Sequence, residues 1–199
     1  MDLNDYTYNP EPRLSFFDGI KTHLIDFIQT LVVFGAIFTL IYLFVAQFHK
    51  VSGKSMLETM HDGDYLITEK ISYRLGDPHR GEIVVLKDPL DETKDFIKRI
   101  IAIPGDSVKI ESGRVFVNGT QIDEPYLVPD IQTRGGAFLS EGTTITIEAN
   151  KYLVFGDNRN HSSDSREWGG VTKEEIVGRA LFRYWPPKSI GLLTNRVIN

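Results

Sequence analysis

The sequence predicts a mostly β fold of antiparallel sheet, preceded by one N-terminal transmembrane helix. One apolar run, Phe27–Phe48, contains no charged residue. After about residue 50, short runs of β-branched and aromatic residues alternate with turn residues, as is typical of β-strands. The chain has 199 residues, 41% hydrophobic and 25% charged, which suits one domain with a packed core. We therefore expect an N-terminal tail over 1–21, an anchor helix over 22–49 and a β-rich domain over 50–199.

The apolar run has the length of a membrane span. As a helix it would extend roughly 33 Å, enough to cross the hydrocarbon core of a bilayer. A buried helix of a soluble protein is the alternative, but such a helix is rarely apolar on every face. A cleavable signal peptide has a shorter apolar segment preceded by basic residues, whereas Asp26 precedes this run and no small-x-small site closes it. The run therefore predicts a retained membrane anchor.

Charge does not determine the orientation of this anchor. Two basic residues lie near each end of the run, Arg13 and Lys21 before it and Lys50 and Lys54 after it. Because basic residues favour the cytoplasmic side, an equal count leaves the orientation open.

Composition excludes several classes of protein. The net charge of −5 argues against a nucleic-acid binder, which normally carries a basic face. The chain has no cysteine, which excludes disulfides, a cysteine nucleophile and thiolate metal sites. His49 and His61 flank a serine-containing segment, but no further ligand lies at metal spacing, so we expect neither a metal nor an organic cofactor.

Seven strands are predicted in the second domain, over 83–89, 95–103, 106–110, 114–118, 143–149, 151–155 and 180–186. Asn118 and Gly119 separate two of the β-type runs and suit a type I′ hairpin turn, in which both residues have positive φ. The stretch 124–142 is expected to be a long surface excursion. One helix is expected in this domain, over Thr172–Ile176, with Thr172 as its N-cap.

The strand DFIKRIIAI places a lysine among apolar neighbours. If it alternates, Phe96, Lys98, Ile100 and Ala102 share one face and Ile97, Arg99, Ile101 and Ile103 the other. Burial disfavours an ammonium ion, so the pKa of Lys98 should fall, and a neutral lysine can act as a general base towards a hydroxyl. The alternative is a lysine whose head group reaches water or a carboxylate.

The stretch GDNRNHSSDSREWGG (156–170) is dense in polar side chains. Such a stretch is either a solvated loop or a hydrogen-bonded network that supports a site. His161 could belong to a Ser-His-Asp arrangement with Asp157 or Asp164, although a lone loop histidine is more often a surface residue.

Taken in order, these segments resemble the type I signal peptidases, the bacterial membrane-bound Ser–Lys endopeptidases. The matching segments are GKSMLETM (53–60), RGEIVVLKDP (80–89), FIKRIIAIPGD (96–106), VNGTQIDEPYL (117–127) and GDNRNHSSDSREWG (156–169). They follow the anchor in the family's order, and the resemblance covers roughly residues 45–187. It implies an antiparallel β-sheet, partial-barrel catalytic domain.

The resemblance also implies roles for particular residues. Ser55 is the nucleophile and Lys98 its general base, Ser162 orients the lysine, and Asp164 supports the site. Ion pairing is expected among the structural motif residues Arg99, Asp157, Asn158, Arg159 and Arg166. Shallow pockets for small substrate side chains are expected along the segments around Ser55 and Lys98, with Met56, Ile97, Ile100 and Ala102 as candidate lining residues.

Two positions depart from the family pattern. Gly53 lies where some members carry a serine that serves as the second oxyanion donor, so the candidates here are the Ser55 backbone N–H and Gly53. Glu58 lies where the family usually has a proline, which removes the fixed φ of that residue and adds a charge.

The resemblance further implies substrates, partners and location. The catalytic domain would lie on the outer face of the cytoplasmic membrane and cut preproteins after small residues at −1 and −3. Membrane lipid is an expected partner, contacted near Met56–Met60 and the FRYWPP stretch, and the secretion translocase is another. A self-cleaving Ser–Lys regulator and a non-catalytic preprotein-binding domain are the alternative functions.

Overall fold

The described part of the N-terminal unit is one long helix. In this computed structural model, residues 16–89 and 91–193 are described, and the chain divides into two compact units, Met1–Ile41 and Tyr42–Asn199. Helix α1 covers Phe16–Phe44, and its span Gly19–Phe44 has a mean hydropathy of 2.2 with none of its apolar window buried. The helix therefore fits a transmembrane anchor by length and composition. It begins earlier than expected, inside the predicted tail, whose residues 1–15 lie outside the described part.

The apolar run extends beyond the helix that it predicts. The helix ends at Phe44, and strand β1 (Ala46–Lys50) takes up the last three residues of the run. β1 pairs antiparallel with β2 (Tyr65–Glu69), with Phe48 opposite Ile67. Hydrophobicity alone cannot distinguish the end of a helix from the start of an apolar strand, which is why the boundary expected at residue 49 is wrong.

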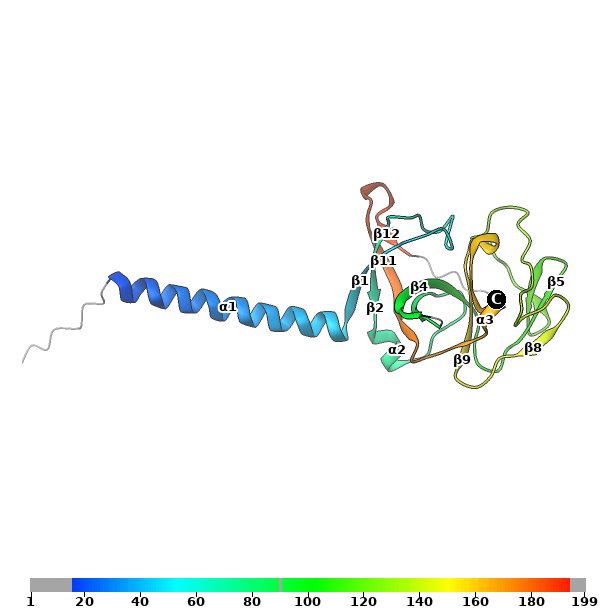
Figure 1. Cartoon of the computed structure of the whole chain (residues 1–199), viewed down its shortest axis with the longest axis horizontal. Helices are drawn as coiled ribbons and strands as arrows, with labels where there is room; N and C mark the ends of the chain where they lie inside the picture. Colours follow the sequence, from blue (N-terminus) through cyan, green and yellow to red (C-terminus); the bar gives the residue numbers. More distant parts are fainter. Residues whose placement is uncertain (1–15, 90, 194–199) are drawn as a thin grey trace, which may run out of the picture. The chain divides into compact units, whose positions relative to one another are not determined.

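The second unit is mostly antiparallel β-sheet, as the sequence predicts (Figure 1). A larger sheet has the order β1-β2-β11-β3-β4-β9-β10, and β12 pairs with β11. Besides β1 and β2, its strands are β3 (Ile83–Asp88), β4 (Asp91–Ala102), β9 (Lys151–Phe155), β10 (Val171–Thr172), β11 (Ile176–Trp185) and β12 (Gly191–Leu192). A smaller sheet, of order β7-β6-β5-β8, contains β5 (Ser107–Glu111), β6 (Arg114–Val117), β7 (Thr120–Gln121) and β8 (Thr144–Thr146).

Helical structure in this unit is short. Within residues 45–89 and 91–193 it consists of α2 (Ile71–Leu75), α3 (Ser165–Trp168) and two 3₁₀ turns, Arg159–His161 and Pro187–Ser189. The helix expected over Thr172–Ile176 is wrong, because Thr172 ends β10 and Ile176 begins β11. The Thr172 N–H donates to the Glu175 carboxylate at 2.6 Å. The sequence signature of a helix cap therefore forms a tight turn between two strands.

The turn between β6 and β7 is the predicted one. Asn118 has φ 52° and Gly119 has φ 80°, so both central residues adopt the positive φ that a type I′ hairpin requires. Val117 and Thr120 pair directly across the turn. This prediction is confirmed.

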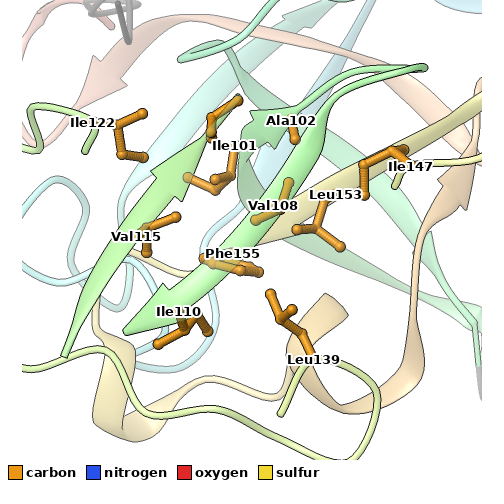
Figure 2. Packing of buried hydrophobic residues seen from close by; sticks show 11 residues of the cluster. Ile101, Ala102, Val108, Ile110, Val115, Ile122, Leu139, Ile147, Leu153 and Phe155 are labelled. Atoms are coloured by element: carbon orange, nitrogen blue, oxygen red, sulfur yellow. The ribbon is translucent and has the colours of Figure 1, made fainter. Parts of the chain in front are cut away.

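The larger sheet is buried on both faces along β3, and three apolar clusters make up the core. Ile83 and Val85 pack into a cluster with Met56 and Met60, while Val84 and Leu86 face the opposite cluster. The third cluster joins the smaller sheet to β4 and β9 (Figure 2). It contains Ile101, Ala102, Val108, Ile110, Val115, Val117, Ile122, Leu139, Ile147, Leu153 and Phe155. Burial of both faces fixes the register of β3 and of its neighbour β4.

The alternation expected along β4 holds only as far as Ile100. The pairing of β4 with β9 shifts register between Ile100 and Ala102. Ala102 consequently joins Ile101 in the cluster of Figure 2, and Ile103 packs with the cluster of Ile100. Such an irregularity reverses the facing of the residues that follow it, so the face predicted for Ala102 is wrong.

Candidate active site

A cleft of about 300 Å³ lies between two sheet edges in the second unit. One wall is the segment 49–56, which begins at the end of edge strand β1, and the other is residues 95–98 of β4. These β4 residues pair with β3 on one side, whereas β9 pairs with β4 only from Arg99 onward. Ser55 and Lys98 both line the cleft.

Lys98 is buried, and its cross-strand partner on β3 is Val84. Its side chain is among apolar neighbours, with Nζ 4.9 Å from the ring centre of Phe96. Burial lowers the pKa of Lys98 to about 8, against the opposing attraction of the Asp164 carboxylate, while Arg166 lowers this pKa further. The burial of Lys98 expected from the sequence is therefore present. With this pKa, about half of the Lys98 amines are neutral at pH 8.

Ser55 lies in the loop that joins β1 to β2. Backbone hydrogen bonds continue past the paired strands, since the Val51 N–H donates to Asp64 O at 2.8 Å and the Gly63 N–H donates to Val51 O at 3.0 Å. Asn158 holds the serine from the other side. Its N–H donates to Ser55 O at 2.9 Å, and its side-chain amide donates to Lys54 O, also at 2.9 Å. The 156–170 loop therefore fixes the backbone at Ser55.

Gly156 allows Ser55 and Ser162 to approach the same point. A β-carbon at position 156 would lie 2.3 Å from Ser162 Oγ and 2.5 Å from Ser55 O, which no side chain could tolerate. Ser162 Oγ is buried and has no hydrogen-bond partner among the described residues. Buried hydroxyls without a partner are rare in folded proteins, and a role in a functional site is one reason for them.

Arg99 and Asp157 form a buried, bidentate ion pair behind the cleft. The guanidinium donates to the two carboxylate oxygens at 2.9 and 2.7 Å, and both side chains are at most 1% exposed. Arg99 also donates to Gly81 O at 2.8 Å, and Thr59 donates to the Asp157 carboxylate at 2.5 Å. Asp157 thus ties the serine-bearing loop to the strand that carries Lys98.

The two arginines of the 156–170 loop, Arg159 and Arg166, bind different carboxylates. Arg166 pairs with Asp164, which also accepts the Gly156 N–H at 3.0 Å. Arg159 is buried, pairs with Glu124 and donates to Gly156 O at 3.0 Å. These bonds hold the Gly156 peptide between two ion pairs. Glu124, the partner of Arg159, begins the excursion over 124–142.

The structure corrects several of the expected site residues. Met56 and Ile97 line the cleft, but Ile100 and Ala102 do not, because both are fully buried in core clusters. The N–H of Gly53 donates to Asp62 Oδ1 at 2.9 Å, so this candidate oxyanion donor is already bonded. Glu58 is exposed in the loop, and nothing in the structure explains its substitution for proline.

Among the described residues, His161 forms no hydrogen bond or ion pair with Asp157 or Asp164, so the Ser-His-Asp alternative is not assembled. His161 lines the cleft, but its Nδ1 lies 3.2 Å from Asn158 Oδ1. Asp157 and Asp164 are each held by an arginine.

Sequence reasoning missed His49, Val85, Asp95 and Ser163 as cleft residues. The available signal was that His49 and Asp95 each lie a few residues before a proposed catalytic residue. Without the sheet order, nothing indicated that the two segments face one another.

The chain matches known proteins over most of its length. The family model "Signal peptidase, peptidase S26" matches residues 24–185. The "Probable signal peptidase I-2" of Synechocystis sp. is 45% identical over 158 residues, covering 76% of this chain and 69% of that protein. The "Signal peptidase I" of Leptolyngbya laminosa is 37% identical over 194 residues (92% and 87%), and the "Signal peptidase IB" of Staphylococcus aureus is 32% identical over 178 residues (84% and 92%).

Among solved structures, a signal peptidase I from Enterococcus faecalis is similar with a TM-score of 0.43 and 24% identity. It covers 51% of this chain and 95% of that one.

A cleft that holds a serine and a buried lysine suits the class of serine peptidases. The chain belongs to the signal peptidase I family, peptidase S26, and is a serine endopeptidase of the kind that removes signal peptides.

Proposed function

We propose that this chain cleaves preproteins by a Ser55–Lys98 dyad. The observation that supports it is the buried Lys98, whose pKa is lowered to about 8, in the same cleft as Ser55. A lysine with this pKa has a substantial neutral fraction near physiological pH, as a general base requires.

The proposed reaction proceeds through an acyl-enzyme. Ser55 Oγ attacks the scissile carbonyl carbon while the neutral Lys98 amine takes the hydroxyl proton. The C–N bond then breaks, and the Lys98 ammonium gives its proton to the leaving amine. A water molecule, deprotonated by the same amine, attacks the Ser55 ester, and Ser55 recovers its proton as the signal peptide leaves as an acid. The Ser55 N–H is the proposed donor to the developing oxyanion, and the unpartnered Ser162 hydroxyl is proposed to orient the Lys98 amine.

The free edges of the cleft favour an extended substrate. A peptide that enters between the 49–56 segment and β4 can add as a strand, with main-chain hydrogen bonds to residues 95–98. The apolar part of the lining consists of Val51, Met56, Val85, Phe96 and Ile97. We propose that this part accepts the small side chains at −1 and −3.

Membrane lipid is the second proposed partner. Met56 and Met60, expected at the lipid surface, are 2% and 1% exposed, so that part of the expectation is wrong. Phe48 and Trp185 are instead about half exposed, and Phe48 packs edge-on against Tyr184 at 5.8 Å between ring centres. We propose that this aromatic surface contacts lipid, with α1 as the anchor and the β unit on the outer side of the cytoplasmic membrane.

The test of the dyad is the cleavage of one purified preprotein by the full chain in detergent. Ser55→Ala and Lys98→Met should each lower kcat/KM by at least about a thousandfold, because both act as one unit. Ser140→Ala, at an exposed residue, and Lys109→Met, at a partly exposed one, are controls outside the cleft that should keep wild-type activity. Circular dichroism checks the fold. Near-wild-type cleavage by either dyad variant would overturn the assignment. Binding of the preprotein without cleavage by the wild type would favour the non-catalytic alternative.

A further inference from the structure

A polar bridge joins the two walls of the cleft that contains Ser55 and Lys98. His49 on β1 and Asp95 on β4 meet with Nε2 3.3 Å from Oδ2, and their side chains are 14% and 29% exposed. Lys87 on β3 donates to the other carboxylate oxygen, Asp95 Oδ1, at 2.7 Å. The second ring nitrogen of the histidine, Nδ1, lies 3.0 Å from Thr68 Oγ1 on β2. Four strands of the larger sheet, β1, β2, β3 and β4, therefore contribute to one hydrogen-bonded chain.

The bonding of this chain indicates its protonation. Burial lowers the pKa of His49, with Asp95 acting in the opposite direction, so the imidazole is neutral at physiological pH. The neutral ring then donates Nε2–H to Asp95 and accepts the Thr68 hydroxyl at Nδ1. A carboxylate has about four acceptor positions, and His49 and Lys87 use one on each oxygen. Asp95, which lines the cleft, keeps acceptor capacity for a donor that enters it.

Strand geometry gives the substrate position that meets Asp95. Side chains two residues apart in a strand share a face and lie about 7 Å apart. If the −1 side chain packs against Ile97 beside the dyad, the next side chain on that face is −3. Along β4, two residues from Ile97 on the same face is Asp95, and both residues line the cleft. The −3 side chain therefore lies at the level of the polar bridge.

We propose that Asp95, held by His49, makes this peptidase prefer a small hydroxyl-bearing side chain at −3 over an apolar side chain of the same shape. This preference rests on the proposed function of the cleft. A serine or threonine hydroxyl at −3 donates to the carboxylate, whereas a valine covers the carboxylate and removes water from it without replacing the lost bond. His49 is a positioning residue, because it fixes the carboxylate and does not itself contact the substrate.

A purely structural role for the bridge makes a different prediction. A bridge that only ties β1 to β4 would affect every substrate alike when it is broken. A recognition role changes the ratio between two substrates. Threonine and valine have nearly the same shape, so a pair of peptides that differ only in this residue isolates the hydroxyl.

The experiment uses the full chain in detergent and two fluorogenic peptides with alanine at −1 and either threonine or valine at −3. We expect the wild type to cleave the threonine peptide with about tenfold higher kcat/KM, the ratio typical of one hydrogen bond to a charged group. Asp95→Leu should reduce the ratio to one or below, and His49→Phe should reduce it severalfold. His49→Gln, which keeps an amide donor, should retain most of it. His61→Phe, on an exposed histidine outside the cleft, should leave it unchanged.

The outcomes separate this proposal from the dyad. Cleavage of both peptides with equal kcat/KM by the wild type, or an unchanged ratio in Asp95→Leu, overturns the −3 preference and leaves the peptidase function intact. Absence of cleavage of both peptides by a folded wild-type chain overturns the two together. If Asp95→Leu is unfolded, Asp95→Asn is used instead, and an unchanged ratio in that variant also overturns the proposal.

Discussion

The proposed base predicts how activity depends on pH. Only the neutral amine of Lys98 can take the proton of Ser55, so kcat/KM should rise with pH through an apparent pKa of about 8. The neutral fraction is about one tenth at pH 7 and about nine tenths at pH 9, which gives a roughly tenfold rise. A lysine at its ordinary value of 10.5 would be neutral about 300-fold less often at pH 7. Burial at the cleft therefore accounts for a large part of the expected activity.

The same burial should reduce stability. The folded-state pKa lies below the unfolded one, so the unfolded chain binds more protons, and the penalty is complete below about pH 8 and disappears as pH rises towards 10.5. Lys98→Met should therefore abolish cleavage and raise the free energy of unfolding by up to about 3 kcal/mol at pH 7. This difference should diminish between pH 8 and 10.5.

The assay is the initial rate of cleavage of one peptide between pH 6 and 10, with chemical denaturation of wild type and Lys98→Met in the same detergent. His161→Gln serves as the control for a histidine base and should leave the profile unchanged. A flat profile between pH 7 and 9, or a transition near the ordinary histidine value of about 6.5, would refute the assignment of Lys98.

Three further changes test the surroundings of the dyad. Gly156→Ala should lower kcat by more than about a hundredfold, because its β-carbon would displace Ser162 and the Ser55 carbonyl; wild-type kinetics would show that this contact is not needed. Asp157→Ala should lower the free energy of unfolding by about 3–5 kcal/mol, since it leaves a buried guanidinium unpaired; an unchanged denaturation midpoint would contradict this. Trp185→Ser should weaken liposome binding of a fragment that lacks α1, and unchanged binding would remove the proposed lipid surface.

Those parts of the fold that depend only on residues adjacent in the sequence could be predicted from it. The Asn118-Gly119 turn follows from the φ angles that two residues can adopt, and the burial of Lys98 follows from the apolar residues beside it. The strands β3, β5, β6 and β9 likewise have local signatures. The helix expected from Thr172 failed because its capping pattern is also satisfied by a turn, and only the pairing of the flanking strands decides between them.

Long-range pairing decides the features that the sequence did not predict. The bulge in β4 arises from its pairing with β9 and determines which residues after Ile100 reach each cluster. Ile100 and Ala102 were expected to line the pocket because the family resemblance implies apolar pockets along the segment that carries Lys98, but both side chains are buried in core clusters. The bridge between His49 and Asp95 depends on the order of the strands in the sheet, which brings β1 and β4 to opposite walls of one cleft.

The ion pairs around the cleft explain how the pKa of Lys98 can stay low beside a carboxylate. Asp164 alone would stabilise the Lys98 ammonium and raise its pKa, which would remove the base at pH 7. Arg166 binds both oxygens of that carboxylate, at 2.8 and 2.9 Å, and its own charge lowers the pKa of Lys98. The pair therefore presents little net charge to the lysine, while the Asp164 carboxylate still accepts the Gly156 N–H that holds the loop under Ser55. One carboxylate can position the nucleophile because the charge of an arginine opposes its stabilisation of the Lys98 ammonium.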